Sequence, residues 1–315
     1  MFGFLVRRCM GAVLVLVLAT VGTFLLGALV PGDPARMMLG PLATQDQIAA
    51  VRARWGLDEP LPVQFGVWVE RMVVHGDFGR SPFYNMTNLE LLSKVLPVTL
   101  ELMLLSFVLS LAVSIALGLA TARHRGSTFD RITMGIIMVV SAVPDFVLAS
   151  VLLLVFTVKL RLLPSANYVS FATDPVANLS RMVLPTISMM AFYIAQLTRY
   201  VRSASIEIGS STYIAAARAR GLSERAVKYK HILRNALIPL LTIAGVHITY
   251  ALGGVIVQET VFSLPGIGRL ALAAILNRDF WVLRTIVLFT AVVAVVLSLV
   301  IDLAYGLIDP RIRYD

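Results

Sequence analysis

The feature that most constrains this chain is the recurrence of long stretches without a charged residue. Five stretches have no charged residue: Cys9–Val30, Leu102–Ala122, Met182–Thr198, Ala236–Gln258 and Thr285–Ile301. A sixth stretch, Ile132–Val158, has one charge, Asp145. About 20 apolar residues in a helix cross the ~30 Å hydrocarbon core of a bilayer, because each residue rises ~1.5 Å. Lipid offers the backbone no hydrogen-bond partner, so the sequence predicts an all-α integral membrane protein with six transmembrane helices.

The composition argues against the alternative, a large buried helical core in a soluble protein. Hydrophobic residues make up 58% of the chain and charged residues 14%, whereas soluble domains are about 25% charged. Helices of this composition would have almost no polar face to turn toward water. The first stretch follows Arg7 and Arg8, as the core of a cleaved signal peptide would. It is long for one, however, and ends in Val30-Pro31-Gly32-Asp33 rather than a small-residue cleavage site. We interpret it as a retained helix.

The distribution of charge predicts how the helices are oriented. The net charge is +9. If both termini lie in the cytoplasm, the cytoplasmic segments contain 15 of the 27 basic residues but only 6 of the 18 acidic ones. This matches the positive-inside rule, and the opposite orientation would place the basic run Arg218–Arg234 outside. We therefore expect both termini to be cytoplasmic.

This orientation divides the chain into a membrane-embedded core and a smaller hydrophilic part. Residues 1–30 form the cytoplasmic N-terminus and first helix, and residues 31–96 a small external helical cap. The core, residues 97–308, is followed by a cytoplasmic tail, 309–315. Within the core we expect helices at 97–122, 132–158, 182–202, 236–260 and 283–307, a cytoplasmic loop at 203–235 and an external loop at 261–282.

The expected cap contains two helical patterns separated by a turn. Thr44 is a candidate N-cap for a helix beginning at Gln45. The turn-rich segment Gly56–Pro62 ends that helix, and Val63–His75 has apolar residues at helical spacing. A disordered loop is the alternative, but the aromatic residues favour packing.

The expected cytoplasmic loop combines a long helix with a short amphipathic one. Ser203–Arg220 continues the fourth span, Gly221 breaks the pattern, and Ser223 can cap a helix over Glu224–Asn235. The short helix has apolar residues on one side and basic residues on the others. Such a helix lies along the membrane surface or docks against a soluble partner.

The sequence contains no motif for catalysis or energy conversion. It has one cysteine, Cys9, four dispersed histidines, no phosphate-binding glycine loop, no Gly-x-Ser-x-Gly elbow and no His-Glu-x-x-His motif. We therefore expect no catalytic, cofactor or metal site. A transport role would need an external source of energy.

Three ionisable residues are candidates for a translocation pathway: Asp145, His247 and Glu259. Intramembrane ionisable groups are functional candidates by default, although a helix-packing hydrogen bond is an equal alternative for His247. Two other classes of function remain open on these residues. One is a secondary transporter using Asp145, and the other a membrane-embedded enzyme using Asp145 and Glu259.

One cytoplasmic segment resembles a known motif. Tyr213–Ser223 is similar to the "EAA" coupling loop of ABC importer permeases, in which Glu-Ala-Ala is followed by three residues and then Gly. Ala215 stands where the glutamate would be, while Ala216, Ala217 and Gly221 match. The continuation His231–Pro239 resembles the peptide-importer branch, in which loss of that glutamate is common.

Further segments agree along nearly the whole chain. They are Leu29–Ala35, Gly56–Phe65 with Gly76–Ser81, Glu259–Gly268, and Asp309-Pro310-Arg311. Together they resemble the B-type permease subunit of dipeptide, oligopeptide and nickel ABC importers.

The resemblance implies a type I ABC importer permease in a bacterial cell membrane. Its partners would be a homologous second permease in a heterodimer, two ABC ATPases that bind ATP and Mg, an external substrate-binding protein and membrane lipid, with no nucleic acid. Peptide is the default substrate, from family breadth, and nickel chelates or haem are alternatives. Contact with the binding protein would fall to Leu264, Pro265, Gly266, Ile267 and Gly268. ATPase coupling would fall to Ala215, Ala216, Ala217, Gly221, Leu222, Ser223, Arg225, Lys228, Tyr229, His231, Arg234 and Asn235.

Overall fold

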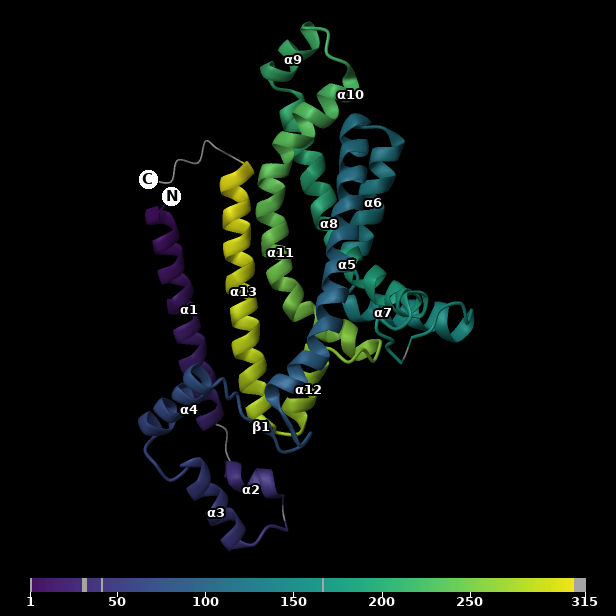
Figure 1. Ribbon diagram of the computed structural model, residues 1–315. Coiled ribbons are helices and arrows are strands. Elements are labelled where there is room, and N and C mark those ends of the chain that lie inside the picture. The colour runs from purple at the N-terminus through teal and green to yellow at the C-terminus, as the bar shows by residue number, and fades with distance from the viewer. Residues whose placement is uncertain (1, 30–32, 41, 166, 309–315) are drawn as a thin grey trace. The chain divides into compact units, whose positions relative to one another are not determined.

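The computed structural model describes residues 2–29, 33–40, 42–165 and 167–308, and this part of the chain is almost entirely helical (Figure 1). The elements are α1 (Phe2–Leu29), α2 (Pro34–Leu39), α3 (Gln45–Trp55), α4 (Leu61–His75), β1 (Arg80–Ser81), β2 (Met86–Thr87), α5 (Asn88–Arg123), α6 (Thr128–Ala142), α7 (Asp145–Leu152), the π-helix η1 (Leu153–Lys159), α8 (Pro175–Gly209), α9 (Thr212–Ala219), α10 (Glu224–Ala226), the π-helix η2 (Val227–Leu233), α11 (Arg234–Val261), α12 (Ile267–Leu276) and α13 (Phe280–Ile308).

These elements form two compact units. The first contains the described residues up to Pro97 together with Leu270–Val295. The second contains Val98–Arg269 and the described residues from Val296 onward. Three helices, α5, α12 and α13, contribute residues to both units.

Three of the described helices are long and apolar enough to cross a membrane by themselves. They contain the segments Val6–Leu25, Asn88–Arg123 and Phe280–Val300. The bent pair formed by α6 and the α7–η1 segment counts as a fourth if it is one broken span. The remaining two expected spans, 182–202 and 236–260, lie within α8 and α11, which are continuous over 35 and 28 residues.

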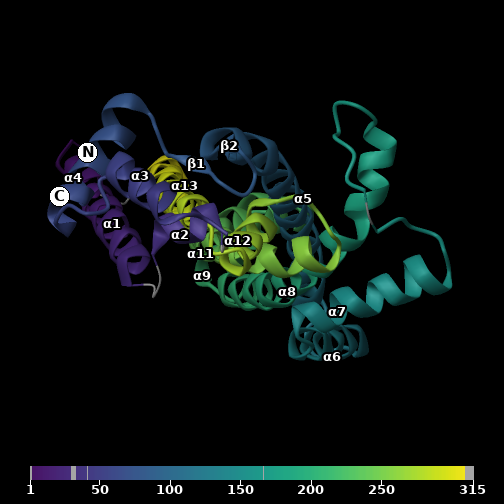
Figure 2. The same ribbon diagram turned by 90° about the horizontal axis from the view of Figure 1, so that it is seen from below.

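The third span is not the continuous helix that the apolar run 132–158 predicts. It breaks at Val143–Pro144, and the two halves meet at an angle of 100° (Figure 2). Val143 adopts φ −83° and ψ 126°, as expected of a residue before proline, which is disfavoured in the helical region. Pro144 also has no N–H to donate into the preceding turn. Asp145 is therefore the first residue of α7 and not a mid-helix residue.

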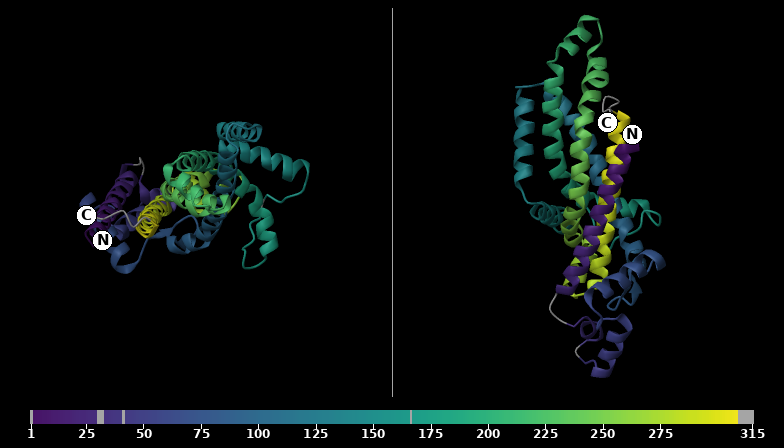
Figure 3. Two further views of the ribbon diagram at one scale, coloured as in Figure 1. Left: turned by 90° about the horizontal axis from the view of Figure 1, so that it is seen from above. Right: turned by 90° about the vertical axis from the view of Figure 1, so that its left-hand side faces the viewer.

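The helices expected in segment 31–96 form within the first unit. Thr44 caps α3 as predicted, in a reciprocal capping box with Gln47. Gly56 ends α3 with a left-handed φ of 63°, which glycine adopts without a steric penalty. In the same unit, α1 and the Phe280–Val295 part of α13 lie side by side (Figure 3).

A short antiparallel hairpin of β1 and β2 is tied to the start of α13 in the first unit. Asp279 accepts hydrogen bonds from the Ser81 hydroxyl and from the Val282 amide at 3.2 Å. The Asn88 side-chain amide donates to the Thr285 hydroxyl at 2.9 Å. Asp279 thus supplies an acceptor at the N-terminus of α13, where amides lack partners within the helix, and Asn88 adds a second link to the same helix.

Helix α8 is central to the second unit, where it packs against α6, α7 and α11. Its buried face includes Met182, Leu197 and Val201. Gly118 of α5 meets α8 so closely that a Cβ there would lie 2.6 Å from the Val201 side chain. Small residues at such crossings let helix backbones approach, which drives helix association in membranes.

A buried ion pair joins α6 to α8. Arg202 donates to both carboxylate oxygens of Asp130, each at 2.7 Å, and the Gly126 amide donates a third bond at 2.9 Å. Asp130 is 3% exposed. Bidentate Arg–carboxylate pairs are strong and geometrically specific, so this pair fixes the start of α6 against α8.

We expect Asp130→Asn to destabilise the protein because it breaks the bidentate pair and leaves Arg202 without its counter-charge. The loss should be about 2 kcal/mol, which corresponds to a fall of roughly 5 °C in the thermal unfolding midpoint. Unfolding in detergent, followed by intrinsic fluorescence, measures it. In a double-mutant cycle with Arg202→Gln, the double variant should lose clearly less than the sum of the single losses. Additive losses would show that the pair does not couple the helices.

Candidate functional site

The segment that resembles a coupling loop folds as a helical hairpin at one end of α8 and α11 (Figure 1). Helix α8 ends at Gly209, and α9 begins after Ser210 and Ser211. The expectation that the fourth span continues to Arg220 is therefore wrong. Both serine hydroxyls donate to carbonyls of the last turn of α8, at 2.8 and 2.7 Å. Such side-chain bonds compete with helix continuation.

The predicted break at Gly221 is confirmed. This residue has φ 79°, a conformation that favours glycine. Ser223 then caps α10 by accepting from the Ala226 amide at 3.3 Å. The expected end at Asn235 is absent, since helical structure continues from α10 through η2 into α11.

Three contacts hold the two arms of this hairpin together. Tyr213 Oη lies 2.6 Å from His231 Nδ1. Across the Gly221 turn, Arg218 Nε donates to Glu224 Oε1 at 2.8 Å. The hydrogen bond from Arg218 holds the pKa of Glu224 below its ordinary value. Buried side chains of Ile214, Ala217 and Val227 form the apolar inside of the hairpin, where α9 packs on η2.

The predicted coupling residues differ in their exposure to solvent. Ala217 faces the inside of the hairpin, and Leu222, Lys228 and His231 are half-buried. The exposed ones are Ala215, Ala216, Gly221, Ser223, Arg225, Tyr229, Arg234 and Asn235.

Glu259 is fully buried at the end of α11 and organises the loop that follows. Thr99 Oγ1 donates to Glu259 Oε1 at 2.6 Å and accepts from the Ile267 amide at 2.8 Å. The Arg269 amide donates to Glu259 Oε2 at 2.9 Å. A carboxylate at a helix N-terminus satisfies amides that have no partner inside the helix and interacts favourably with the helix dipole. Glu259 therefore caps α12.

The two glycines of the loop make room for this arrangement. A Cβ at Gly266 would overlap the Glu259 carboxylate, and one at Gly268 would lie 2.7 Å from Ile256 Cα. Of the five residues predicted to contact a binding protein, only Pro265 is exposed. The other four, Leu264, Gly266, Ile267 and Gly268, are buried within this chain.

Of the three predicted pathway residues, Asp145 and Glu259 have described side chains, and they lie at opposite kinds of helix end, Asp145 at the start of α7 and Glu259 near the end of α11. Asp145 is half-buried at the start of α7, within electrostatic range of Tyr193 on α8. The hydrogen bonds of Glu259 within the described part of the chain go to Thr99 and the start of α12. The side chain of His247 lies outside the described residues.

Among the residues that the structure describes, no group of three or more His, Cys, Asp or Glu side chains could hold a metal ion.

Thr99 is a functional candidate that the sequence did not predict, because its role depends on a contact with Glu259, 160 positions away. The close spacing of Glu259, Gly266 and Gly268 is the signal that could have indicated a carboxylate packed against a glycine turn.

Comparisons with known proteins agree with this architecture. Residues 114–314 match the family described as "Binding-protein-dependent transport system inner membrane component", and residues 1–103 match its N-terminal companion family. A solved structure of the MetNI methionine ABC transporter, in inward-facing conformations, aligns with a TM-score of 0.58 at 16% identity. The alignment covers 70% of this chain and 97% of the other. This likeness confirms the predicted fold, that of a type I importer permease.

Full-length relatives are more similar in sequence. A probable peptide ABC transporter permease of Sinorhizobium fredii is 38% identical over 99% of both chains. A putative peptide transport system permease of Brucella abortus is 37% identical, and a glutathione transport system permease of Salmonella typhi 36% identical, each over 100% of both chains. With both family regions matched and such relatives aligned end to end, the chain belongs to the family of binding-protein-dependent transport system inner membrane components.

Proposed function

We propose that this chain is the permease subunit of an ABC importer that carries peptides, driven by ATP hydrolysis on separate ATPase subunits. The observation that carries the proposal is the hairpin of α9, α10 and η2, which is internally braced and continuous with α11. The names of the full-length relatives support peptides as the substrate class.

The hairpin provides the means of receiving energy from outside the chain. Its exposed face combines two small residues, Ala215 and Ala216, with the bulkier Tyr229 and the charge of Arg225. Small side chains allow close approach of a partner surface. Because η2 runs into α11 without a break, displacement of the hairpin moves a spanning helix directly. If the hairpin and α11 have two conformations, a partner that binds one of them more tightly shifts the equilibrium toward that conformation.

The remaining partners follow from the orientation. The positive-inside pattern favours cytoplasmic termini and a cytoplasmic hairpin, where two ATPases with bound ATP and Mg would dock. A homologous second permease would complete the pathway as a heterodimer. On the external side, Pro265 is an exposed residue of the loop braced by Glu259, and it offers a contact for a substrate-binding protein.

Asp145 is the pathway residue best placed to meet a peptide. It lies at the break between α6 and α7 and is half-buried. A helix break inside a membrane is tolerated where it is buried in protein or lines a water-filled cavity. A carboxylate there suits the ammonium group that every free peptide carries.

The first test is uptake by the reconstituted importer. The chain, its second permease, the two ATPases and the binding protein are placed in proteoliposomes and supplied with radiolabelled dipeptide, oligopeptide, nickel chelate or haem. We expect peptide uptake that requires ATP and all subunits. Uptake without the ATPases would refute the proposal, and uptake of nickel chelate or haem alone would refute the substrate class.

A second prediction concerns docking at the hairpin. Ala216→Trp should reduce co-purification of the ATPases and uptake by at least about tenfold, because a bulky side chain on an exposed contact face keeps the partner surfaces apart. The exposed Ala172, in the segment between η1 and α8, supplies the matched control, Ala172→Trp. Equal co-purification of both variants would show that Ala216 lies outside the ATPase interface.

A third prediction concerns the cap on α12. Glu259→Ala removes charge-assisted hydrogen bonds worth about 2 kcal/mol each, so the loop should lose its fixed shape. We expect binding-protein stimulation of ATP hydrolysis to fall severalfold while the ATPases still co-purify. The neighbouring exposed variant Thr260→Ala should behave as wild type. Unchanged stimulation in Glu259→Ala would contradict a role for the braced loop in contacting the binding protein.

A further inference from the structure

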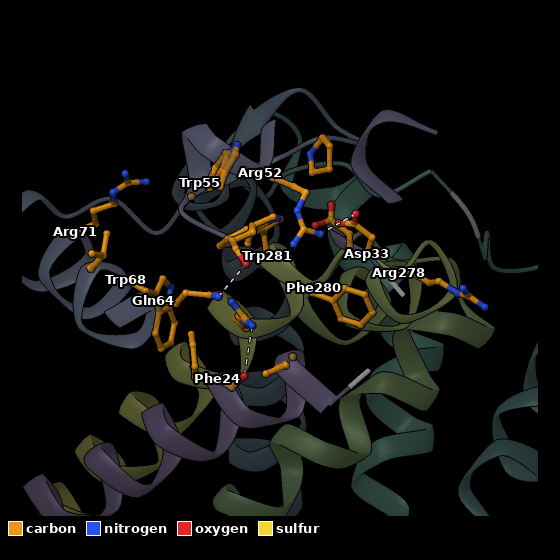
Figure 4. A pocket seen from close by; sticks show the side chains of 18 of the residues that line it. Phe24, Asp33, Arg52, Trp55, Gln64, Trp68, Arg71, Arg278, Phe280 and Trp281 are labelled. Carbon is orange, nitrogen blue, oxygen red and sulfur yellow. Dashed lines mark hydrogen bonds and ion pairs between the residues drawn. The ribbon is translucent and has the colours of Figure 1, made fainter. Parts of the chain in front are cut away.

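A cavity of about 560 Å³ in the first unit has no role in the transport cycle described above (Figure 4). Its lining comes from α1, α3, α4, the region of the β1–β2 hairpin and the start of α13. Figure 4 shows Phe24, Trp68 and Trp281 among the lining side chains, and Arg52 beside Asp33 at another part of the wall. Its volume lies within the range of sites that hold small organic ligands.

Arg284 also lines this cavity, and its guanidinium lies among aromatic rings. The guanidinium carbon lies 5.1 Å from the ring centroid of Phe24, 5.7 Å from that of Trp68 and 5.4 Å from that of Trp281. A methyl group at Gly27 would overlap the guanidinium, so glycine at this position makes room for it. Three elements far apart in sequence thus form an aromatic cage around one cation.

Arg284 has no anionic partner among the described residues, although its guanidinium is largely enclosed by aromatic rings. Within the described ranges no carboxylate forms an ion pair with it, its Nε has no hydrogen-bond partner, and its Nη2 makes one long bond, 3.4 Å, to the Phe24 carbonyl. Each of the three carboxylates that line the cavity has another partner. Asp33 pairs with Arg52 at 3.0 Å, Asp77 accepts from the Gly79 amide at 2.9 Å, and Asp279 binds the Ser81 hydroxyl and the Val282 amide.

Aromatic faces compensate only part of this cost. They attract the cation, but they leave most of its five N–H donors without acceptors. Burying a charge is expensive unless it is both paired and hydrogen-bonded. The planar fork of a guanidinium matches the two oxygens of a phosphate or carboxylate, so an oxyanion is the ligand chemistry that fits.

The position of the cage selects among oxyanions. Phe24 is at the end of the apolar segment Val6–Leu25, and Arg284 is near the start of Phe280–Val300, so both lie where a span leaves the hydrocarbon. Tryptophan favours this interface. Helix α4, which supplies Trp68, also exposes large apolar side chains, with Val73 71% and Val74 69% exposed, as expected of a helix that rests on a membrane surface.

We propose that this cavity binds the phosphate of a membrane phospholipid headgroup, held by Arg284 inside the cage of Phe24, Trp68 and Trp281. The acyl chains would lie along the apolar surface of α1, where Leu18 and Leu25 are 63% and 46% exposed. The bound lipid supplies the counter-charge that the described part of the chain lacks.

The test uses the full chain purified in detergent with its partner subunits and washed free of lipid. Dioleoyl phosphatidylglycerol is added, and bound lipid is counted by native mass spectrometry alongside the shift in thermal unfolding midpoint. We expect the wild type to retain the lipid and to be stabilised. Arg284→Gln should weaken binding by about tenfold or more, since a charge-assisted bidentate contact is lost. The exposed Arg36, which does not line the cavity, provides the control variant Arg36→Gln.

Added ligands separate the sources of the oxyanion. Dioleoylglycerol has no phosphate and should not stabilise the protein, and neither should inorganic phosphate at equal concentration. Equal lipid retention in the wild type and Arg284→Gln would overturn the proposal. So would full stabilisation by dioleoylglycerol, by inorganic phosphate or by a short peptide.

Two further variants keep the test decisive if Arg284→Gln does not fold. Arg284→Lys keeps the charge but loses the fork, and should bind the lipid more weakly than wild type. Gly27→Ala should displace the guanidinium and weaken lipid binding without changing charge. Wild-type lipid binding in both variants would overturn the assignment of Arg284.

Discussion

The hydrogen bonding of backbone amides at helix ends is the constraint on which the rest of this structure depends. A bilayer offers such groups no partner, so each break in an apolar helix needs its own acceptor or a residue without an N–H. Both solutions are present. Pro144 stands at the break in the third span, while Glu259 and Thr99 accept the first amides of α12. Asp279 does the same for α13. Helix ends whose amides have partners in this way keep a defined geometry, and the long helices between them can move as rigid bodies.

Under the proposed function, this constraint explains how a motion of the hairpin of α9, α10 and η2 would reach the spans. The hairpin joins α8 through a serine-marked break and joins α11 through continuous helical turns. Close packing at Gly118 and the bidentate pair of Asp130 with Arg202 hold α5 and α6 to α8. Coupling between distant sites is carried by packed elements that move together. Under the proposed function, the braced hairpin and α11 form the input side of such a path.

The spans and the coupling turn could be predicted because their signals are local. A run such as Leu102–Ala122 is long enough to cross a bilayer, and Gly221 interrupts a helical pattern at a position that needs a left-handed φ. The bend at Pro144 also had a local signal, but the apolar run around it suggested one continuous helix. The partners of Glu259 were not predictable from spacing, because Thr99 lies 160 positions away on another helix. The same holds for Arg202 with Asp130, 72 positions apart.

Three charged side chains show why the unassigned cavity differs from the rest of the structure. Asp130 is neutralised by a bidentate arginine and a backbone amide. Glu259 forms no ion pair with any of the described residues, yet a hydroxyl and a helix N-terminus satisfy its oxygens. Arg284 has aromatic faces and one long hydrogen bond. The first two have their partners within the described chain, whereas the third leaves donors that an oxyanion would satisfy. Since the cage lies where two spans leave the hydrocarbon, the surrounding membrane is the nearest source of that oxyanion.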